Sequence, residues 1–149
     1  MGREDLHDAA PKVGHQGKDI AQHAEFAFWF VFGFVVWLAA TIAFALIGDL
    51  FFERGAIVYA VFIGFVCSAA VSLFGIVAHM RKLRGKIVLQ AAVTFSIAGM
   101  LGEIPVMMTF PKLVPALAAE TAGAYSGFLF LGYSALLTYA LAAGRVRRS

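Results

Sequence analysis

Four long runs of apolar residues, almost free of charge, constrain this chain more than any other feature of its sequence. They lie at about residues 26–48, 56–80, 87–110 and 121–143. As a helix rising about 1.5 Å per residue, each run is long enough to cross a hydrocarbon core of roughly 30 Å. The hydrophobic fraction of 61% is above that of ordinary water-soluble domains. We therefore predict an all-α membrane protein, a bundle of four transmembrane helices within residues 25–144.

The two ends of the chain are polar and are predicted to lie outside the membrane. Residues 1–24 mix acids, bases, Gly and Pro without a helical period, so we expect a flexible cytoplasmic tail. Residues 145–149 form a second, short basic tail.

Basic residues set the predicted orientation. The segment 81–86 holds four Lys or Arg and the C-terminal tail holds three, against one each in the other two loops. Such residues near span ends favour the cytoplasmic side, so with four spans both termini are predicted to be cytoplasmic. We expect a multi-pass protein of the cell inner (plasma) membrane. Because the bases flank apolar runs and form no stripe, they do not indicate nucleic-acid binding.

A short internal match joins the ends of the first and third spans. Leu46–Leu50 and Met100–Ile104 each place a Gly-acid pair toward the outer side, which aligns Asp49 with Glu103. The match leaves open whether the bundle consists of two parallel-repeat helical hairpins.

Several short motifs in the membrane portion suggest a family. They are Trp37–Thr41 running into Gly48–Phe52, then Gly99–Glu103, Phe110-Pro111 with Pro115, and Gly132-Tyr133. Over about residues 32–141 the chain resembles a domain-of-unknown-function family of small bacterial four-helix membrane proteins. The resemblance implies a four-helix fold. Because the family has no assigned activity, it carries over no catalytic or ligand-binding residue.

Glu103 is the first candidate for a functional residue. A carboxylate within hydrocarbon costs several kcal/mol unless it is protonated, paired or facing water. Counted from the basic loop, Glu103 lies about 16 residues, or roughly 24 Å, into the third span, just short of the outer interface. Gly99, Gly102 and Pro105 nearby leave room for a proton or cation site. The alternative is an interfacial acid paired with Lys112.

Small residues at every fourth position indicate helix-packing faces. The second span carries Ala56, Ala60, Gly64, Ser68 and Ser72, and the fourth carries Gly123 and Gly127 after Ala119. Small side chains at this spacing let two helix backbones approach closely. The partner is another span or another subunit, and we favour packing within the chain for at least one face.

His23 and His79 lie at the cytoplasmic ends of the first two spans, adjacent if these form an antiparallel hairpin. Such a pair could hold a metal or haem, but an interfacial imidazole is commonly a headgroup anchor, so we predict no cofactor.

Aromatic residues with polar tips fall into two groups. Near the span ends, as in an interfacial belt, lie Trp29, Tyr59, Tyr125 and Tyr139. Trp37 and Tyr133 lie deeper and need internal hydrogen-bond partners. Candidate partners are Thr41, Thr94, Ser96 and Ser134.

The motifs of common enzymes are missing from the sequence. It contains no nucleophile with a base and acid in register, no phosphate-binding loop and no His-Glu metal motif, and its single cysteine, Cys67, excludes an internal disulfide. We predict a non-catalytic accessory or assembly subunit that packs in a homo-oligomer or a larger membrane complex. The alternative is a small oligomeric transporter or ion-coupled carrier that uses Glu103.

Overall fold

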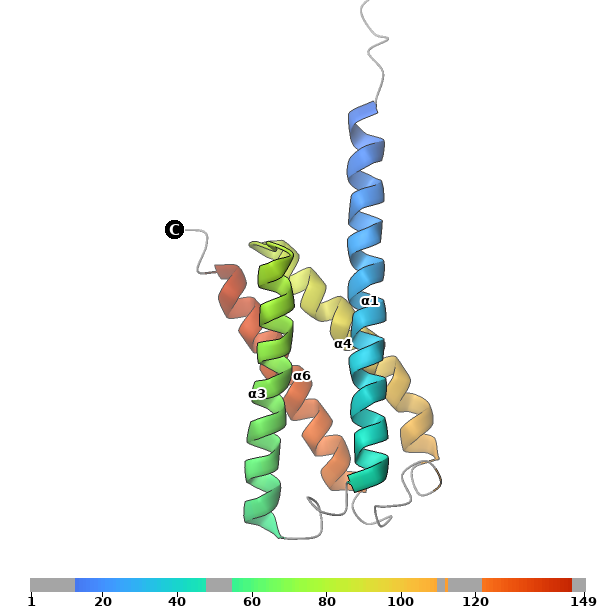
Figure 1. Cartoon of the computed structure of the whole chain (residues 1–149), viewed down its shortest axis with the longest axis vertical. Helices are drawn as coiled ribbons and strands as arrows, with labels where there is room; N and C mark the ends of the chain where they lie inside the picture. The colour runs from blue at the N-terminus through green and yellow to red at the C-terminus, as the bar shows by residue number, and fades with distance from the viewer. Residues whose placement is uncertain (1–12, 48–54, 110–111, 113–121, 146–149) are drawn as a thin grey trace, which may run out of the picture.

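The computed structural model describes residues 13–47, 55–109, 112 and 122–145 of the chain. These ranges contain no strand and form the four long helices α1 (Val13–Ile47), α3 (Ala56–Met80), α4 (Lys86–Met108) and α6 (Ala122–Arg145) (Figure 1). Each holds a segment long and apolar enough to cross a membrane, namely Gln22–Leu46, Ala56–Met80, Lys86–Met108 and Tyr125–Arg145. The predicted all-α fold of four membrane-length helices is confirmed.

Helix α1 begins earlier than the sequence pattern indicated. Its first residue is Val13, so residues 13–24, which we expected in a flexible tail, are helical. In Figure 1 this end of α1 projects beyond the other three helices. The physical reason is that a helix nucleated by the apolar span gains one hydrogen bond for each residue added, whereas starting a new helix is costly. Residues 1–12 lie outside the described ranges.

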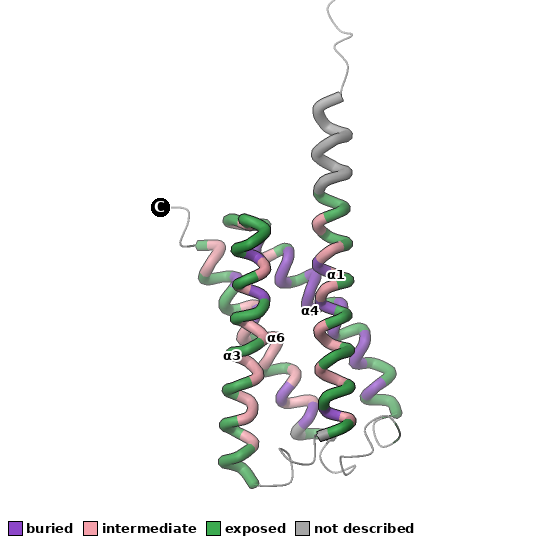
Figure 2. The backbone as a smooth tube through the Cα atoms, viewed as in Figure 1, coloured by how far each residue is buried: buried purple, intermediate pink, exposed green. Residues whose placement is uncertain are grey.

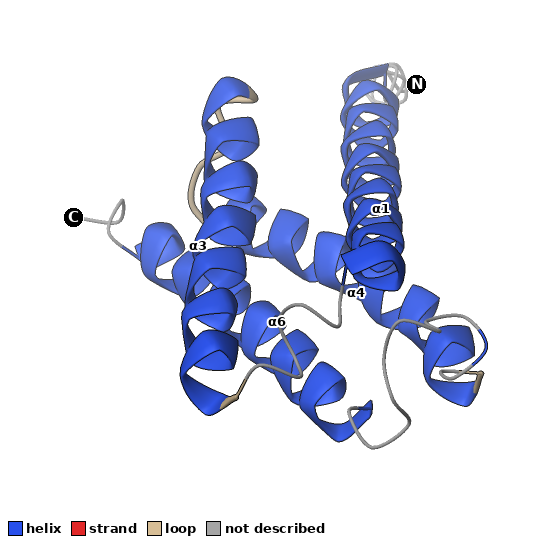
Figure 3. Cartoon of the chain, turned by 60° about the horizontal axis from the view of Figure 1, so that its bottom comes forward, coloured by secondary structure: helices blue, strands red, loops and turns tan. Residues whose placement is uncertain are grey.

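The order of packing differs from the order in the chain. Helix α1 packs against α4, α4 against α6, and α6 against α3. Figures 1 and 3 show α4 and α6 running obliquely behind α1 and α3, which stand apart for most of their length. The first two spans therefore do not pack as the antiparallel hairpin that we expected.

Helix α4 is the central helix of the bundle, and most of its buried positions follow one another closely along it (Figure 2). Its buried residues are Val88, Ala91, Ala92, Thr94, Phe95, Ser96, Ala98, Gly99, Gly102, Glu103 and Val106. A polar side chain on this helix is therefore enclosed by protein more often than by lipid.

Gly33 determines how α1 crosses α4. A Cβ atom at this position would collide with the backbone of Phe95, including its carbonyl carbon at 3.0 Å. Only a glycine allows the two backbones to approach this closely, which is how small residues bring membrane helices together. The crossing places residues 34–46 of α1 beside the second half of α4.

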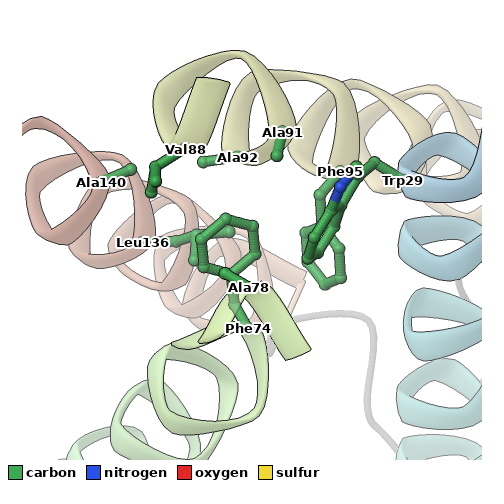
Figure 4. Packing of buried hydrophobic residues seen from close by; sticks show 9 residues of the cluster. All are labelled: Trp29, Phe74, Ala78, Val88, Ala91, Ala92, Phe95, Leu136 and Ala140. Carbon is green, nitrogen blue, oxygen red and sulfur yellow. The ribbon is translucent and has the colours of Figure 1, made fainter. Parts of the chain in front are cut away.

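Two apolar clusters fill the bundle, one toward each end. The cluster nearer the basic loop, shown in Figure 4, comprises Trp29, Phe74, Ala78, Val88, Ala91, Ala92, Phe95, Leu136 and Ala140. The other comprises Phe44, Val106, Tyr125 and Phe128. Large rings bridge the space between the helices that stand apart: the ring centroids of Trp29 and Phe74 are 4.9 Å apart, and those of Phe44 and Phe62 are 5.7 Å apart.

Candidate functional site

Glu103 lies inside the bundle and accepts hydrogen bonds from two other helices. Its side chain is on α4 and the residue is only 8% exposed. The indole Nε1 of Trp37, from α1, donates to Oε2 at 3.2 Å, and the hydroxyl of Tyr125, from α6, donates to Oε1 at 2.8 Å. One carboxyl group therefore joins three of the four helices.

Two glycines of α4 make room for the aromatic rings around this carboxyl group. A Cβ atom at Gly102 would lie 2.7 Å from atoms of the Trp37 indole, so the ring rests directly on the helix backbone. The Tyr133 hydroxyl occupies the corresponding space at Gly99. We expected these glycines to admit another helix or a cation, and the structure places aromatic side chains there instead.

The alternative interpretation of Glu103 as an interfacial acid paired with Lys112 does not fit this arrangement. Lys112 is exposed, and within the described ranges no ion pair links it to Glu103. The partners of the carboxyl group are uncharged, so burial of a charge here is compensated by hydrogen bonds alone.

The donor set indicates which ligand suits Glu103. A tryptophan N–H can only donate, whereas a tyrosine hydroxyl donates or accepts. Among the described residues no group of three or more His, Cys, Asp or Glu side chains could hold a metal ion. Both partners can therefore donate to an ionised Glu103, and of the two only Tyr125 can also accept a hydrogen bond.

A cavity of about 100 Å³ lies between the four helices beside these residues. Its walls include Trp37 of α1, Cys67 of α3, Gly99 of α4 and Tyr133 of α6. Its lining is almost entirely apolar, and apolar cavities of this size stay dry. Since Leu136, another wall residue, belongs to the cluster nearer the basic loop, the cavity extends from the surroundings of Glu103 toward that end.

The hydroxyl groups that we expected to satisfy the deep aromatic residues have other roles. Trp37 bonds to Glu103, and the Thr94 hydroxyl donates to the Gln90 carbonyl of its own helix at 2.9 Å. The hydroxyl oxygen of Ser96 is buried and completes no hydrogen bond within the described part of the chain, and the Thr41 hydroxyl lies beside that of Tyr125. A carboxylate with four acceptor sites is the stronger partner for an indole N–H, which explains the difference.

Two aromatic residues assigned to an interfacial belt are buried. Trp29 and Tyr125 are each 1% exposed. The Trp29 indole donates to Oε1 of Glu25 at 2.8 Å, and the Tyr125 hydroxyl bonds to Glu103. Both rings carry a polar tip next to an acid, and this pairing favours the bundle interior over the headgroup layer.

The small-residue face of α3 is open in the described part of the structure. All five of its members are exposed, and a Cβ atom at Gly64 would meet nothing within 4 Å. Gly123 is likewise open, whereas Gly127 of α6 faces the Tyr59 hydroxyl of α3. A packing role for the α3 face therefore stays a prediction, and the described helices of this chain supply no partner for it at Gly64.

The structure does not bring His23 and His79 into a ligand cluster. Both residues are exposed, one on α1 and one near the end of α3. The two histidines would be neighbours if α1 and α3 packed together as a hairpin, but the main packing partner of α1 is α4.

Two predictions reach residues outside the described ranges. Asp49, the proposed repeat equivalent of Glu103, is one of them, and Ala119 of the fourth-span packing face is another. The internal repeat therefore stays a prediction.

The sequence pattern missed one ion pair that joins α1 to the loop after α3. Arg81 donates from Nη2 to Oε2 of Glu25 at 2.7 Å and from Nε to Oε1 at 2.9 Å. The guanidinium carbon also lies 3.9 Å from the ring centroid of Phe28. The signal in the sequence that could have found this pair was Glu25, a single acid at the start of the first span, which lies at the same predicted membrane side as the basic segment 81–86.

Comparison with known proteins identifies a family but no activity. Residues 51–146 match the family of unknown function DUF5367, a stretch that includes Glu103 and Tyr125 but not Trp37. No match was found among curated proteins or among solved structures.

Proposed function

Because the chain belongs to the DUF5367 family, whose function is unknown, we propose its function from the geometry around Glu103. We propose that the protein is a small membrane carrier that couples movement of its substrate to proton binding at this carboxyl group. The substrate itself is left unassigned.

The observation that carries the proposal is a carboxyl group at 8% exposure, within a membrane-length helix, that accepts hydrogen bonds from Trp37 and Tyr125. Ionisable groups within membrane spans are costly and commonly mark proton or ion pathways. A purely structural link between helices could be made by an uncharged amide at lower cost.

Protonation of Glu103 changes what its partners can do. The ionised group accepts bonds from both Trp37 and Tyr125, whereas the protonated group keeps fewer acceptor sites and gains a donor. Trp37 cannot accept that proton's hydrogen bond, so a proton on Oε1 turns the neighbouring Tyr125 hydroxyl from donor to acceptor. Since these residues belong to α1 and α6, proton binding at α4 alters how three helices are held together, which is the coupling that a carrier needs.

The central cavity does not provide a water path for this exchange. Its walls include Trp37 and Tyr133 but are almost entirely apolar, and apolar cavities of this size stay dry. The proposal therefore rests on the hydrogen bonds of Glu103 to Trp37 and Tyr125, and not on water in this space.

The test is proton movement into vesicles that contain the purified full chain and a trapped pH-sensitive dye. After an imposed pH step, the wild type is expected to acidify the lumen faster than protein-free vesicles. Glu103→Gln keeps the shape of the side chain but cannot exchange a proton, so its rate is expected to fall at least about tenfold.

Lys112→Gln is the matched control for this test. It removes the charge that was considered as a partner of Glu103, and because Lys112 is exposed its loss should leave the rate unchanged. Vesicles with wild-type protein that remain as proton-tight as empty ones, or a Glu103→Gln variant as fast as wild type, would contradict the carrier proposal.

A second candidate function, that of an accessory or assembly subunit, is favoured by the exposed face of α3. This face is defined by Ala56, Ala60, Gly64, Ser68 and Ser72. Helix α3 packs mainly along α6 among the described elements, and close approach of small residues is a strong source of helix association in lipid.

The variants Gly64→Leu and Phe65→Leu test whether the small-residue face of α3 is covered by a partner protein or faces lipid. Neither side chain is enclosed within the chain, since Gly64 has open space and Phe65 is 71% exposed. Neither change should therefore alter thermal unfolding of the isolated protein. Mild-detergent affinity purification should lose co-purifying subunits only with Gly64→Leu, because a leucine there prevents close approach of a partner helix. Equal recovery of partners with both variants would show that this face contacts lipid.

A further inference from the structure

A second and larger cleft lies at the other end of the bundle from Glu103. It has a volume of about 970 Å³ and opens between α1, the loop after α3 and the first turns of α4. Its walls come from Gln22, Glu25, Phe26 and Trp29, from residues 81–84, and from Ile87, Leu89, Gln90, Ala91, Val93 and Thr94 of α4. Because α3 ends at Met80 and α4 begins at Lys86, this cleft is at the level where the spans leave the hydrocarbon.

The charges in the cleft are unbalanced. Arg81, Lys82 and Arg84 line it together with one acid, Glu25. Arg81 is committed to Glu25 through two hydrogen bonds of 2.7 and 2.9 Å, with Phe28 against its guanidinium group. No ion pair within the described residues uses Lys82 or Arg84. Two cations are therefore available to an anion entering the cleft.

The remainder of the cleft is apolar and accessible. Phe26 is 58% exposed and Ile87 is 49% exposed, and both lie in its walls beside the cations. Large apolar side chains next to two cations at the membrane boundary match a molecule with an anionic head and a hydrocarbon body. Basic pockets between transmembrane helices recognise anionic lipid headgroups by this chemistry.

We propose that this cleft binds an anionic phospholipid, with its phosphate at Lys82 and Arg84 and its acyl chains along Phe26 and Ile87. The site is separate from Glu103, and its occupation requires no carrier activity. A cleft of about 970 Å³ accommodates a headgroup and the first part of the acyl chains.

Native mass spectrometry of the full chain released from detergent tests the assignment. The protein is titrated with phosphatidylglycerol, with phosphatidylcholine, whose headgroup has no net charge, and with soluble glycerol phosphate. Phosphatidylglycerol is expected to bind most tightly. The double variant Lys82→Gln with Arg84→Gln should weaken that binding about 30-fold, which corresponds to about fivefold for each of the two basic groups.

Lys86→Gln is the matched control, since Lys86 belongs to the same basic segment but does not line the cleft. Its phosphatidylglycerol affinity should equal that of the wild type. Phe26→Ala should weaken binding of the lipid and leave glycerol phosphate unaffected. Thermal unfolding without lipid should be the same for all of these variants, because every substituted residue is exposed.

Several outcomes would overturn the assignment. Equal affinity for phosphatidylcholine and phosphatidylglycerol would show that the cleft does not select an anionic headgroup. The same conclusion would follow if Lys86→Gln and the double variant lost equal amounts of phosphatidylglycerol affinity. Glycerol phosphate binding as tightly as the lipid would assign the cations to a soluble phosphate. A second copy of the chain retained in place of lipid, and lost in the double variant, would assign the cleft to a protein interface.

Discussion

A carboxyl group within an apolar bundle loses its hydration and must recover the cost from groups that the fold provides. Glu103 does so through an indole N–H and a phenol O–H that belong to helices distant in the sequence. The glycine next to it in the chain is part of the same arrangement, since Gly102 is where the Trp37 ring rests on α4.

Gly102→Ala is expected to destabilise the protein by about 2 kcal/mol, because the added methyl group must displace a buried indole. The displacement also lengthens the Trp37 hydrogen bond to Glu103. Thermal unfolding in detergent measures the loss of stability. Gly132→Ala on α6 is the control, since a Cβ atom there meets nothing within 4 Å, and it should unfold like the wild type. Equal unfolding temperatures for both variants would mean that Trp37 does not rest on Gly102.

At the scale of elements, α1 depends on α4 for most of its packing, and its contact with the end of α3 is made by side chains. The Glu25–Arg81 pair is the polar part of that contact. Its hydrogen bonds raise the pKa of the Arg81 guanidinium above its usual value, so the group stays charged. The pair sits at the mouth of the lipid cleft and holds one of its walls in position.

Glu25→Gln is expected to lower stability by about 1 kcal/mol or less, because the two side chains are 27% and 37% exposed and partly screened by water. Thermal unfolding at low and at high salt measures the effect, and the difference from wild type should shrink as salt rises. Arg84→Gln, which removes a charge of the same loop without breaking an ion pair of the described residues, should change stability less. A loss of thermal stability in Glu25→Gln that does not depend on salt would indicate that Glu25 stabilises the protein by packing and not by an ion pair.

For the whole molecule, the position of the basic residues supports a proposed orientation in which both termini are cytoplasmic. Four Lys or Arg lie in residues 81–86 and three after Ala143, against Arg54 and Lys112 in the other two loops. The lipid cleft then faces the cytoplasmic leaflet, where anionic lipids attract basic segments.

Reporter fusions check this orientation. Fusions after Gly85 and after Arg148 should both report the cytoplasm, and a fusion near Leu113 should report the outside, because basic residues near span ends are retained inside. A C-terminal reporter active outside the cell would contradict the orientation and would move the lipid cleft to the outer leaflet.

The sequence by itself determined the number of membrane-length helices and, except for the start of α1 at Val13, their approximate limits. Lipid offers no hydrogen bonds to the backbone, so an apolar run long enough to span must form a helix, whatever its neighbours are. The sequence also singled out Glu103. The free-energy cost of placing a carboxyl group in hydrocarbon follows from its position within an apolar segment, whatever the fold around that segment.

Only the tertiary structure decided which face of each helix meets another. Lipid tails are as apolar as leucine, so a membrane helix can be apolar all round, and its periodicity does not distinguish buried from lipid-facing positions. For this reason the regular small-residue face of α3 is exposed, while Trp29 and Tyr125, near span ends, are buried. The partners of Glu103 depend on α1 and α6 both lying beside α4, an arrangement made by shape at Gly33 and Gly102 and not by hydrophobicity.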